Sequence, residues 1–203
     1  MAHCTASRHS THENRMNDID RHILNTADSL LLVIDLQERL AAAMDQDELQ
    51  RLIRNVAILL DSTQELGLPV LVTEQYVKGL GPTLPALKEK AGHASFHEKI
   101  SFSCCGNDDF MAKLKATGKR QIIVCGTETH VCVLQTVLDL LAAGYTVHVV
   151  KDAVMSRSPD NRQTAIEAMT LAGAIPTCTE TVAFQWLKVA GTETFRKLSK
   201  LVK

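Results

Sequence analysis

The sequence predicts an α/β protein with three layers, in which helices cover both faces of a Rossmann-like parallel sheet of about six strands. Two observations lead to this fold class. A helical stretch that ends at a glycine is followed by a short β-branched run four times along the chain. These runs are apolar throughout, which indicates strands that are buried on both faces. The commonest strand order for such a sheet is 3-2-1-4-5-6, and a chain of 203 residues suits a single domain.

The strands are recognised by their apolar runs and by the glycines before them. Glycine just past a helix tolerates the left-handed conformation that turns the chain back toward a sheet. We expect this role of Gly67, Gly118, Gly144 and Gly173. The runs place strands at residues 29–35, 69–73, 121–124, 145–150 and 174–175, with a weaker candidate at 96–102.

The helices follow from apolar residues that recur three and four positions apart. This spacing predicts helices over residues 47–66, 110–117, 130–143, 160–172 and 192–202. Residues 1–20 are polar and lack such a period. We therefore expect a flexible N-terminal arm there, followed by one domain over residues 21–203.

The composition limits the classes of partner. The chain has 22 basic and 23 acidic residues and a net charge of -1, which argues against nucleic acid or an anionic membrane and favours a small molecule. No apolar run approaches the roughly 20 residues that cross a bilayer. Because the first residues lack the apolar core of a secretory signal, we expect a cytoplasmic protein whose six cysteines stay reduced.

Two residues are predicted to meet at the carboxyl edge of the sheet, where open α/β sheets bind their ligands. Asp35 closes the first strand, and Cys132 follows the fourth strand after a turn that contains glycine. The first turn of a helix favours thiolate over thiol. We therefore expect Cys132 to ionise more readily than a free cysteine, whose pKa is about 8.5. Taken alone, Asp35 could also be a helix cap and Cys132 a buried core residue.

Four segments together resemble the isochorismatase-like hydrolase superfamily. They are Val-Ile-Asp-Leu-Gln around Asp35, Glu-Lys-Ile-Ser-Phe around Lys99, Gly-Thr-Glu-Thr-His-Val-Cys-Val around Cys132, and Gly-Tyr-Thr-Val-His-Val-Val-Lys-Asp-Ala at residues 144–153. Lys99 alone would be read as a surface group. The order and spacing of all four segments are far more specific than any one of them, and the resemblance extends from about residue 25 to the end of the chain.

The resemblance implies a catalytic triad of Asp35, Lys99 and Cys132. It also implies a cis peptide bond at Thr127-Glu128, with the N–H groups of Glu128 and Cys132 as donors of an oxyanion hole. Asp35 would take the thiol proton, Cys132 would attack a carbonyl carbon, and Lys99 would keep the carboxylate ionised.

Departures from the family pattern narrow the expected reaction. Isochorismatases themselves cleave a vinyl ether and generally lack a cysteine at this position, so Cys132 favours hydrolysis of a C–N bond in an amide or ureide through a thioester. Related nicotinamidases hold a metal with histidines after the second strand. Residues 73–82 contain no histidine, so we expect neither a metal nor another cofactor.

The pocket and the assembly are also suggested by resemblance. Gln75 and Tyr76 would border the substrate, and Phe102 and His130 are weaker candidates that could equally be structural. Relatives usually form dimers or larger rings, so a homo-oligomer is expected.

Three alternatives stay open at this point. The protein could cleave a vinyl ether, it could bind a small molecule without turnover, or it could sense peroxide through Cys132 with Cys125 or Cys105. Cys104 and Cys105 are adjacent, a spacing that rarely closes a relaxed disulfide, so packing is the favoured interpretation of this pair.

Overall fold

The computed structural model describes residues 19–202, and most of the expected N-terminal arm lies outside the described residues. One parallel sheet has the order β3-β2-β1-β4-β5-β6, which confirms the predicted fold class and strand order. The strands are β1 (Ser29–Ile34), β2 (Val70–Gln75), β3 (Ser95–Lys99), β4 (Gln121–Thr127), β5 (Thr146–Met155) and β6 (Ile175–Thr177).

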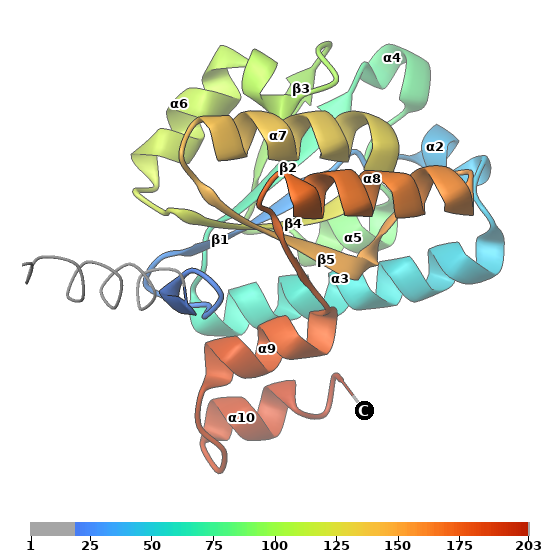
Figure 1. The fold of residues 1–203 in the computed structure, drawn as a ribbon. Helices are drawn as coiled ribbons and strands as arrows, with labels where there is room; N and C mark the ends of the chain where they lie inside the picture. Colours follow the sequence, from blue (N-terminus) through green and yellow to red (C-terminus); the bar gives the residue numbers. More distant parts are fainter. Residues whose placement is uncertain (1–18, 203) are drawn as a thin grey trace, which may run out of the picture.

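Helices cover both faces of the sheet (Figure 1). One layer consists of α6 (Asp108–Ala116), α7 (Leu134–Ala142) and α8 (Pro159–Leu171). The other consists of α3 (Gln46–Leu66), α5 (Pro85–Lys90) and α9 (Thr179–Leu187), with α10 (Glu193–Leu198) packed against α3 and α9. Short helices lie in the connections: α2 (Glu38–Ala42), α4 (Val77–Leu80), the 3-10 turn η1 (Cys104–Gly106) and the π-helix η2 (Thr129–Val133), which leads into α7.

Two apolar cores lie on opposite faces of the sheet because successive side chains of a strand alternate between faces. In β1, Leu31 and Val33 join the core under α3, whereas Leu32 and Ile34 join the core under α6 and α7. Every residue of β1 is therefore buried, as its continuous apolar run predicts.

The boundaries differ from the expected ones at several places. β3 ends at Lys99 instead of residue 102, because the following loop turns back and offers the carbonyls of Ser101 and Phe102 to the Lys99 ammonium. The predicted helix at 130–143 begins as a π-helix, and β5 continues to Met155. The helix α9 was not predicted from the sequence.

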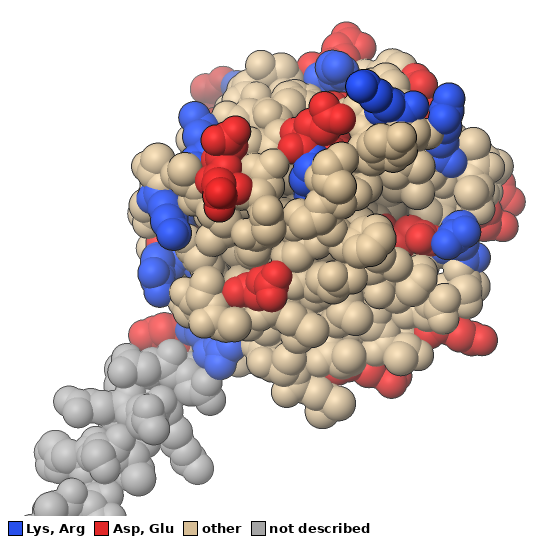
Figure 2. Space-filling model, turned by 90° about the horizontal axis from the view of Figure 1, so that it is seen from above, with Lys and Arg blue, Asp and Glu red and all other residues tan. Residues whose placement is uncertain are grey.

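Charges are mixed on the surface. Basic and acidic side chains both occur around the edge of the face shown in Figure 2, whereas its centre and lower part are largely uncharged. This distribution matches the net charge of -1. Across residues 19–202, no helix combines the length and the apolar character needed to cross a bilayer.

Candidate active site

Asp35 lies where β1 ends, near the middle of the carboxyl edge of the sheet. Its φ of +49° is in the left-handed region, which is uncommon for a residue other than glycine. Both neighbouring strands hold this backbone: the Asp35 N–H donates to the Thr73 carbonyl at 3.1 Å, and the Thr127 hydroxyl donates to the Asp35 carbonyl at 2.7 Å. Strained backbone held in this way is typical of functional sites.

Gly126 allows β4 to lie close to the end of β1. It is the register partner of Ile34 and has a φ of +124°. A Cβ atom at this position would lie 2.0 Å from the Ile34 carbonyl oxygen, so only glycine fits. The loop that carries Cys132 therefore starts directly beside Asp35.

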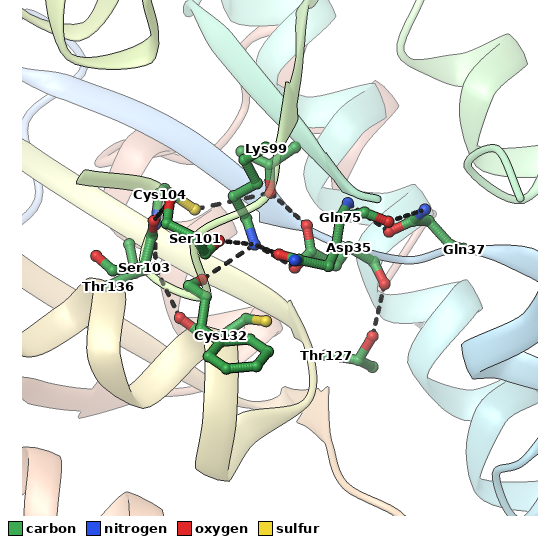
Figure 3. A network of polar contacts seen from close by, with 12 residues as sticks. Asp35, Gln37, Gln75, Lys99, Ser101, Ser103, Cys104, Thr127, Cys132 and Thr136 are labelled. Carbon is green, nitrogen blue, oxygen red and sulfur yellow. Dashed lines mark hydrogen bonds and ion pairs between the residues drawn. The ribbon is translucent and has the colours of Figure 1, made fainter. Parts of the chain in front are cut away.

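Lys99, the last residue of β3, points back toward Asp35 (Figure 3). Its Nζ lies 2.7 Å from Asp35 Oδ2 and 2.6 Å from Gln75 Oε1, and it also donates to the carbonyls of Phe102 at 3.0 Å and Ser101 at 3.3 Å. An ammonium has three N–H donors, so these acceptors use all of them. Lys99 is 2% exposed, and we infer that it holds the carboxylate and the following loop rather than a ligand.

The second oxygen of the Asp35 carboxylate is also bonded. The Thr73 hydroxyl donates to Asp35 Oδ1 at 2.7 Å, and the Cys104 thiol donates to the Thr73 oxygen at 3.7 Å. The carboxylate is thus fixed from two sides, by a hydroxyl and by an ammonium. Charge-assisted hydrogen bonds of this kind favour one orientation of the carboxylate.

Cys132 lies on the π-helix η2 and is 6% exposed. The pKa of its thiol is raised from 9.0 to about 12: burial is the main cause, the charge and hydrogen bond of Asp35 contribute in the same direction, and the charge of Lys99 opposes them. The expected thiolate is therefore wrong for the free protein, because desolvation outweighs the field of the helix terminus. At neutral pH the thiol is protonated, and a reaction at sulfur requires a base.

The loop before Cys132 has the expected cis peptide bond at Thr127-Glu128. The Glu128 carboxylate, 8% exposed, pairs with Arg157 at 2.8 Å. Burial alone would raise the pKa of Glu128, but the hydrogen bonds and charge of Arg157 hold that pKa below its ordinary value. His130 Nδ1 lies 2.9 Å from the Ser156 hydroxyl. Two neighbouring residues after β5 thus clamp the loop.

Tyr76 and Phe102 have the exposure expected of residues at the rim of a pocket. Their side chains are 52% and 54% exposed, respectively. Both flank the Lys99 site: the Tyr76 N–H donates to the Lys99 carbonyl, and the Phe102 carbonyl accepts from the Lys99 ammonium.

Gln75 and His130 are bonded within the protein instead. The Gln75 amide accepts from Lys99 and donates to the Ile100 carbonyl at 2.6 Å. Both polar atoms of Gln75 therefore have protein partners, and its expected contact with substrate stays a prediction. The Nδ1 atom of His130 is likewise engaged, by Ser156.

Sequence reasoning missed the roles of Thr73 and Gln37 in this network, and named Thr127 only for its cis peptide bond. Each of the three lies near the carboxyl end of a strand, which is the only signal in the sequence. The Gln37 amide pairs with the backbone of Gln75 in both directions, at 2.7 and 3.0 Å.

The other cysteines next to the site are protonated as well. Burial raises the pKa of Cys104 to about 12 and that of Cys105 to about 11. Over residues 19–202 the five cysteines are free thiols. In the same range, no three His, Cys, Asp or Glu side chains gather in a way that would hold a metal ion.

A model of the isochorismatase domain family matches residues 29–181. The chain belongs to this family. Isochorismatase domain-containing protein 2 of Danio rerio is 37% identical over 180 residues, covering 88% of this chain and 89% of the relative. The secreted isochorismatase effector Isc1 of Phytophthora sojae is also 37% identical, covering 86% and 84%, respectively.

Solved structures of the isochorismatase fold agree with this assignment. The MAR1 ribonuclease of Caenorhabditis elegans superposes with a TM-score of 0.83 at 39% identity, covering 89% of this chain and 92% of that one. YcaC of Escherichia coli, described as an octameric hydrolase of unknown specificity, gives 0.81 at 28% identity, with 88% and 90% covered. YcaC of Pseudomonas aeruginosa, described with a covalent acrylamide, gives 0.79 at 30% identity, with 89% and 95% covered.

Proposed function

We propose that this isochorismatase-family protein is a cysteine hydrolase that cleaves the C–N bond of a small amide or ureide through a thioester on Cys132. One observation carries the proposal. The Asp35 carboxylate, ion-paired with the buried Lys99 ammonium at 2.7 Å, is near enough for its charge to raise the pKa of the Cys132 thiol, and Figure 3 shows the three residues in one site. A thiol beside a fixed base is the arrangement that nucleophilic catalysis by cysteine requires.

In the first half of the reaction, Cys132 Sγ attacks the carbonyl carbon of the substrate. Because the thiol is protonated at rest, its proton passes to Asp35 as the C–S bond forms. The carbonyl π electrons move to oxygen, and the backbone N–H groups of Glu128 and Cys132 donate to the resulting oxyanion. Asp35 then returns the proton to the leaving nitrogen, the C–N bond breaks, and an acyl thioester remains on Cys132.

In the second half, water attacks the thioester carbon and transfers a proton to Asp35. Collapse of the tetrahedral intermediate breaks the C–S bond and releases a carboxylic acid, and the sulfur takes back the proton from Asp35. Lys99 keeps its proton throughout and holds the carboxylate in place. The chemistry uses only groups of this chain, so the proposal requires no metal and no other cofactor.

The rim residues suggest the class of substrate. Tyr76 and Phe102 offer two exposed aromatic rings next to the triad, and such rings favour contact with flat, partly apolar molecules. We propose a small planar amide or ureide, bordered by these two residues with His130 nearby.

The test is turnover of a panel of small amides and ureides, measured by release of ammonia or amine. The Cys132→Ala variant should lose kcat/KM by about 10⁴-fold or more. Cys178→Ala is the matched control, since this free cysteine is at the start of α9 and outside the site. Equal turnover by wild type and Cys132→Ala would overturn the proposal.

The same experiment tests two alternative functions of the protein. Cleavage of isochorismate that survives in Cys132→Ala would favour an ether hydrolase. Binding without turnover of any compound would favour a catalytically silent binding protein. Because a relative is described as a ribonuclease, RNA belongs in the panel, although the near-neutral charge of this chain leads us to propose a small molecule without nucleic acid or membrane partners.

We also propose a homo-oligomer, a dimer or larger, in the cytoplasm. A relative is described as an octamer, and Ile100, Phe102 and Leu138 expose apolar side chains here. Light scattering on the purified protein tests the assembly. A monomer at micromolar concentration would contradict it, and secretion, as described for the Phytophthora sojae relative, would contradict the location.

A further inference from the structure

The Gln75 side chain is oriented by its partners. Its Nε2 donates to the Ile100 carbonyl at 2.6 Å, which leaves Oε1 to face the Lys99 ammonium, also at 2.6 Å. Since a carbonyl accepts but does not donate, the opposite amide orientation would leave Ile100 facing an oxygen and Lys99 facing an amino group. Only the observed orientation satisfies both neighbours.

Gln37 fixes the backbone that carries Gln75. Its Oε1 accepts from the Gln75 N–H at 2.7 Å, and its Nε2 donates to the carbonyls of Gln75 at 3.0 Å and Gly81 at 2.6 Å. Gln37 is 0% exposed and lies two residues after Asp35. One buried amide therefore ties the end of β2 to the turn that carries the proposed base, as Figure 3 shows.

We propose that Gln75, held in place by Gln37, is a positioning residue that fixes the Lys99 ammonium on Asp35 Oδ2. This inference rests on the proposed function, because it gives Gln75 a role in the triad in place of a contact with substrate. Gln75 and Lys99 are register partners at the ends of β2 and β3, so the contact is built into the sheet. A neutral acceptor is required here. It accepts a hydrogen bond from one N–H of the Lys99 ammonium, and because it carries no negative charge it does not compete with Asp35 for the positive charge of Lys99.

Two substitutions separate the parts of this role. Gln75→Met keeps the length of the side chain and removes the acceptor, so Lys99 is less well fixed; kcat should fall about tenfold with KM little changed. Gln75→Glu adds a second carboxylate that competes with Asp35 for Lys99 and adds negative charge near Cys132. It should lower kcat further, by about 100-fold.

The decisive readout needs no substrate. The rate of Cys132 alkylation by iodoacetamide, located by peptide mass, reports the thiolate fraction. Added negative charge should slow alkylation in Gln75→Glu by about tenfold at a pH near 8, as expected for one unit of pKa. If Gln75 were only structural, its loss would loosen the site and speed alkylation. If it contacted substrate without holding Lys99, the neutral Gln75→Met variant would raise KM and leave alkylation unchanged.

Gln121→Glu is the matched control. Gln121 is 7% exposed, compared with 8% for Gln75, and its amide also bonds in both directions, to the Asn25 N–H and the Ile23 carbonyl at 2.8 Å. It lies at the amino end of β4, away from the triad. Its substitution should lower the melting temperature without slowing alkylation of Cys132.

A double-mutant cycle completes the test. If Gln75 acts through Lys99, then Gln75→Met should change the alkylation rate in a Lys99→Met background by no more than about twofold. If Gln75→Met changed the alkylation rate by the same factor with Lys99 present and in the Lys99→Met background, the inference would be overturned. Should Lys99→Met fail to fold, Gln37→Met replaces it, and slower turnover with unchanged KM is expected. If no amide is hydrolysed but Gln75→Met changes the alkylation rate only when Lys99 is present, the proposed function fails and the positioning role stands.

Discussion

Lys99 Nζ lies 2.7 Å from Asp35 Oδ2, and the two side chains are 1% and 0% exposed. A buried ion pair of this kind is tolerated because each charge neutralises the other and the remaining hydrogen bonds are made. The pair comes from β1 and β3, which lie on opposite sides of β2. Its geometry therefore depends on the whole carboxyl edge of the sheet.

Removal of one partner should destabilise the fold strongly. Lys99→Met leaves the Asp35 carboxylate buried without a counter-charge, and should lower the free energy of unfolding by about 3–5 kcal/mol. Urea denaturation measures this loss. The double variant Asp35→Asn/Lys99→Met should recover part of it, whereas equal stability of wild type and Lys99→Met would contradict a buried pair.

Alkylation of Cys132 should depend on pH as expected for a thiol with a raised pKa. Because that pKa is about 12, the thiolate fraction of the free protein grows steadily through the neutral and mildly alkaline range. The logarithm of the iodoacetamide rate should rise by about one per pH unit up to a pH near 10, without a plateau. A plateau near neutral pH would show an activated thiolate.

Stability should fall in alkaline solution. The thiols of Cys104, Cys105 and Cys132 have pKa values raised from 9.0 to about 12, 11 and 12. Below the unfolded value the thiols are protonated in both states, and the contribution to stability is fully present. Above it the unfolded chain loses protons that the folded protein keeps, so stability falls as pH rises toward the folded values. Urea midpoints that stay constant through this window would refute the burial of these thiols.

Gly126 should not tolerate a side chain. Gly126→Ala places Cβ 2.0 Å from the Ile34 carbonyl oxygen, so we expect a loss above about 4 kcal/mol or failure to fold. Gly118→Ala is the control: it has a φ of +67° and nothing within 4 Å, so it meets only the backbone cost of about 1–2 kcal/mol. Similar losses in thermal unfolding for the two variants would contradict the close approach of β4 to β1.

Arg157 should matter to turnover more than its exposure suggests. It is 61% exposed, but it holds the buried Glu128 carboxylate of the proposed oxyanion loop. Arg157→Met should lower kcat about tenfold by loosening that loop. Lys197→Met removes a comparably exposed cation, paired with Glu65, and should leave kcat unchanged. Equal kcat for Arg157→Met and wild type would show that Arg157 does not hold the proposed oxyanion loop in its active geometry.

The sequence predicted the parts of the site that follow from strand ends. The apolar runs before Asp35 and Cys132 place both residues at the carboxyl edge, and the fold confirms those positions. Lys99 was identified only through the family resemblance, since a lysine on a weak strand carries no signal of its own. Its burial depends on the register of β2 and β3 and on a loop that turns back.

Two features required the structure because they depend on competition between effects. A helix terminus changes an ionisation by about 0.3–1 kcal/mol, whereas full burial shifts a pKa by up to about 3–5 units. The position of Cys132 at the start of a predicted helix indicates the effect of the helix terminus, but the sequence does not show how deeply the thiol is buried. In the same way, the sequence places Gln75 just after the strand predicted at residues 69–73, but only the paired orientations of two amides show that it faces Lys99.

The most direct test of the central claim is the mass of the protein during turnover of a hydrolysed amide, with rapid acid quenching. The account predicts an added acyl group on the peptide that contains Cys132, formed more slowly in Asp35→Asn and absent in Cys132→Ala. Turnover at the wild-type rate with no acyl group on residue 132, or with the group on another cysteine, would contradict it.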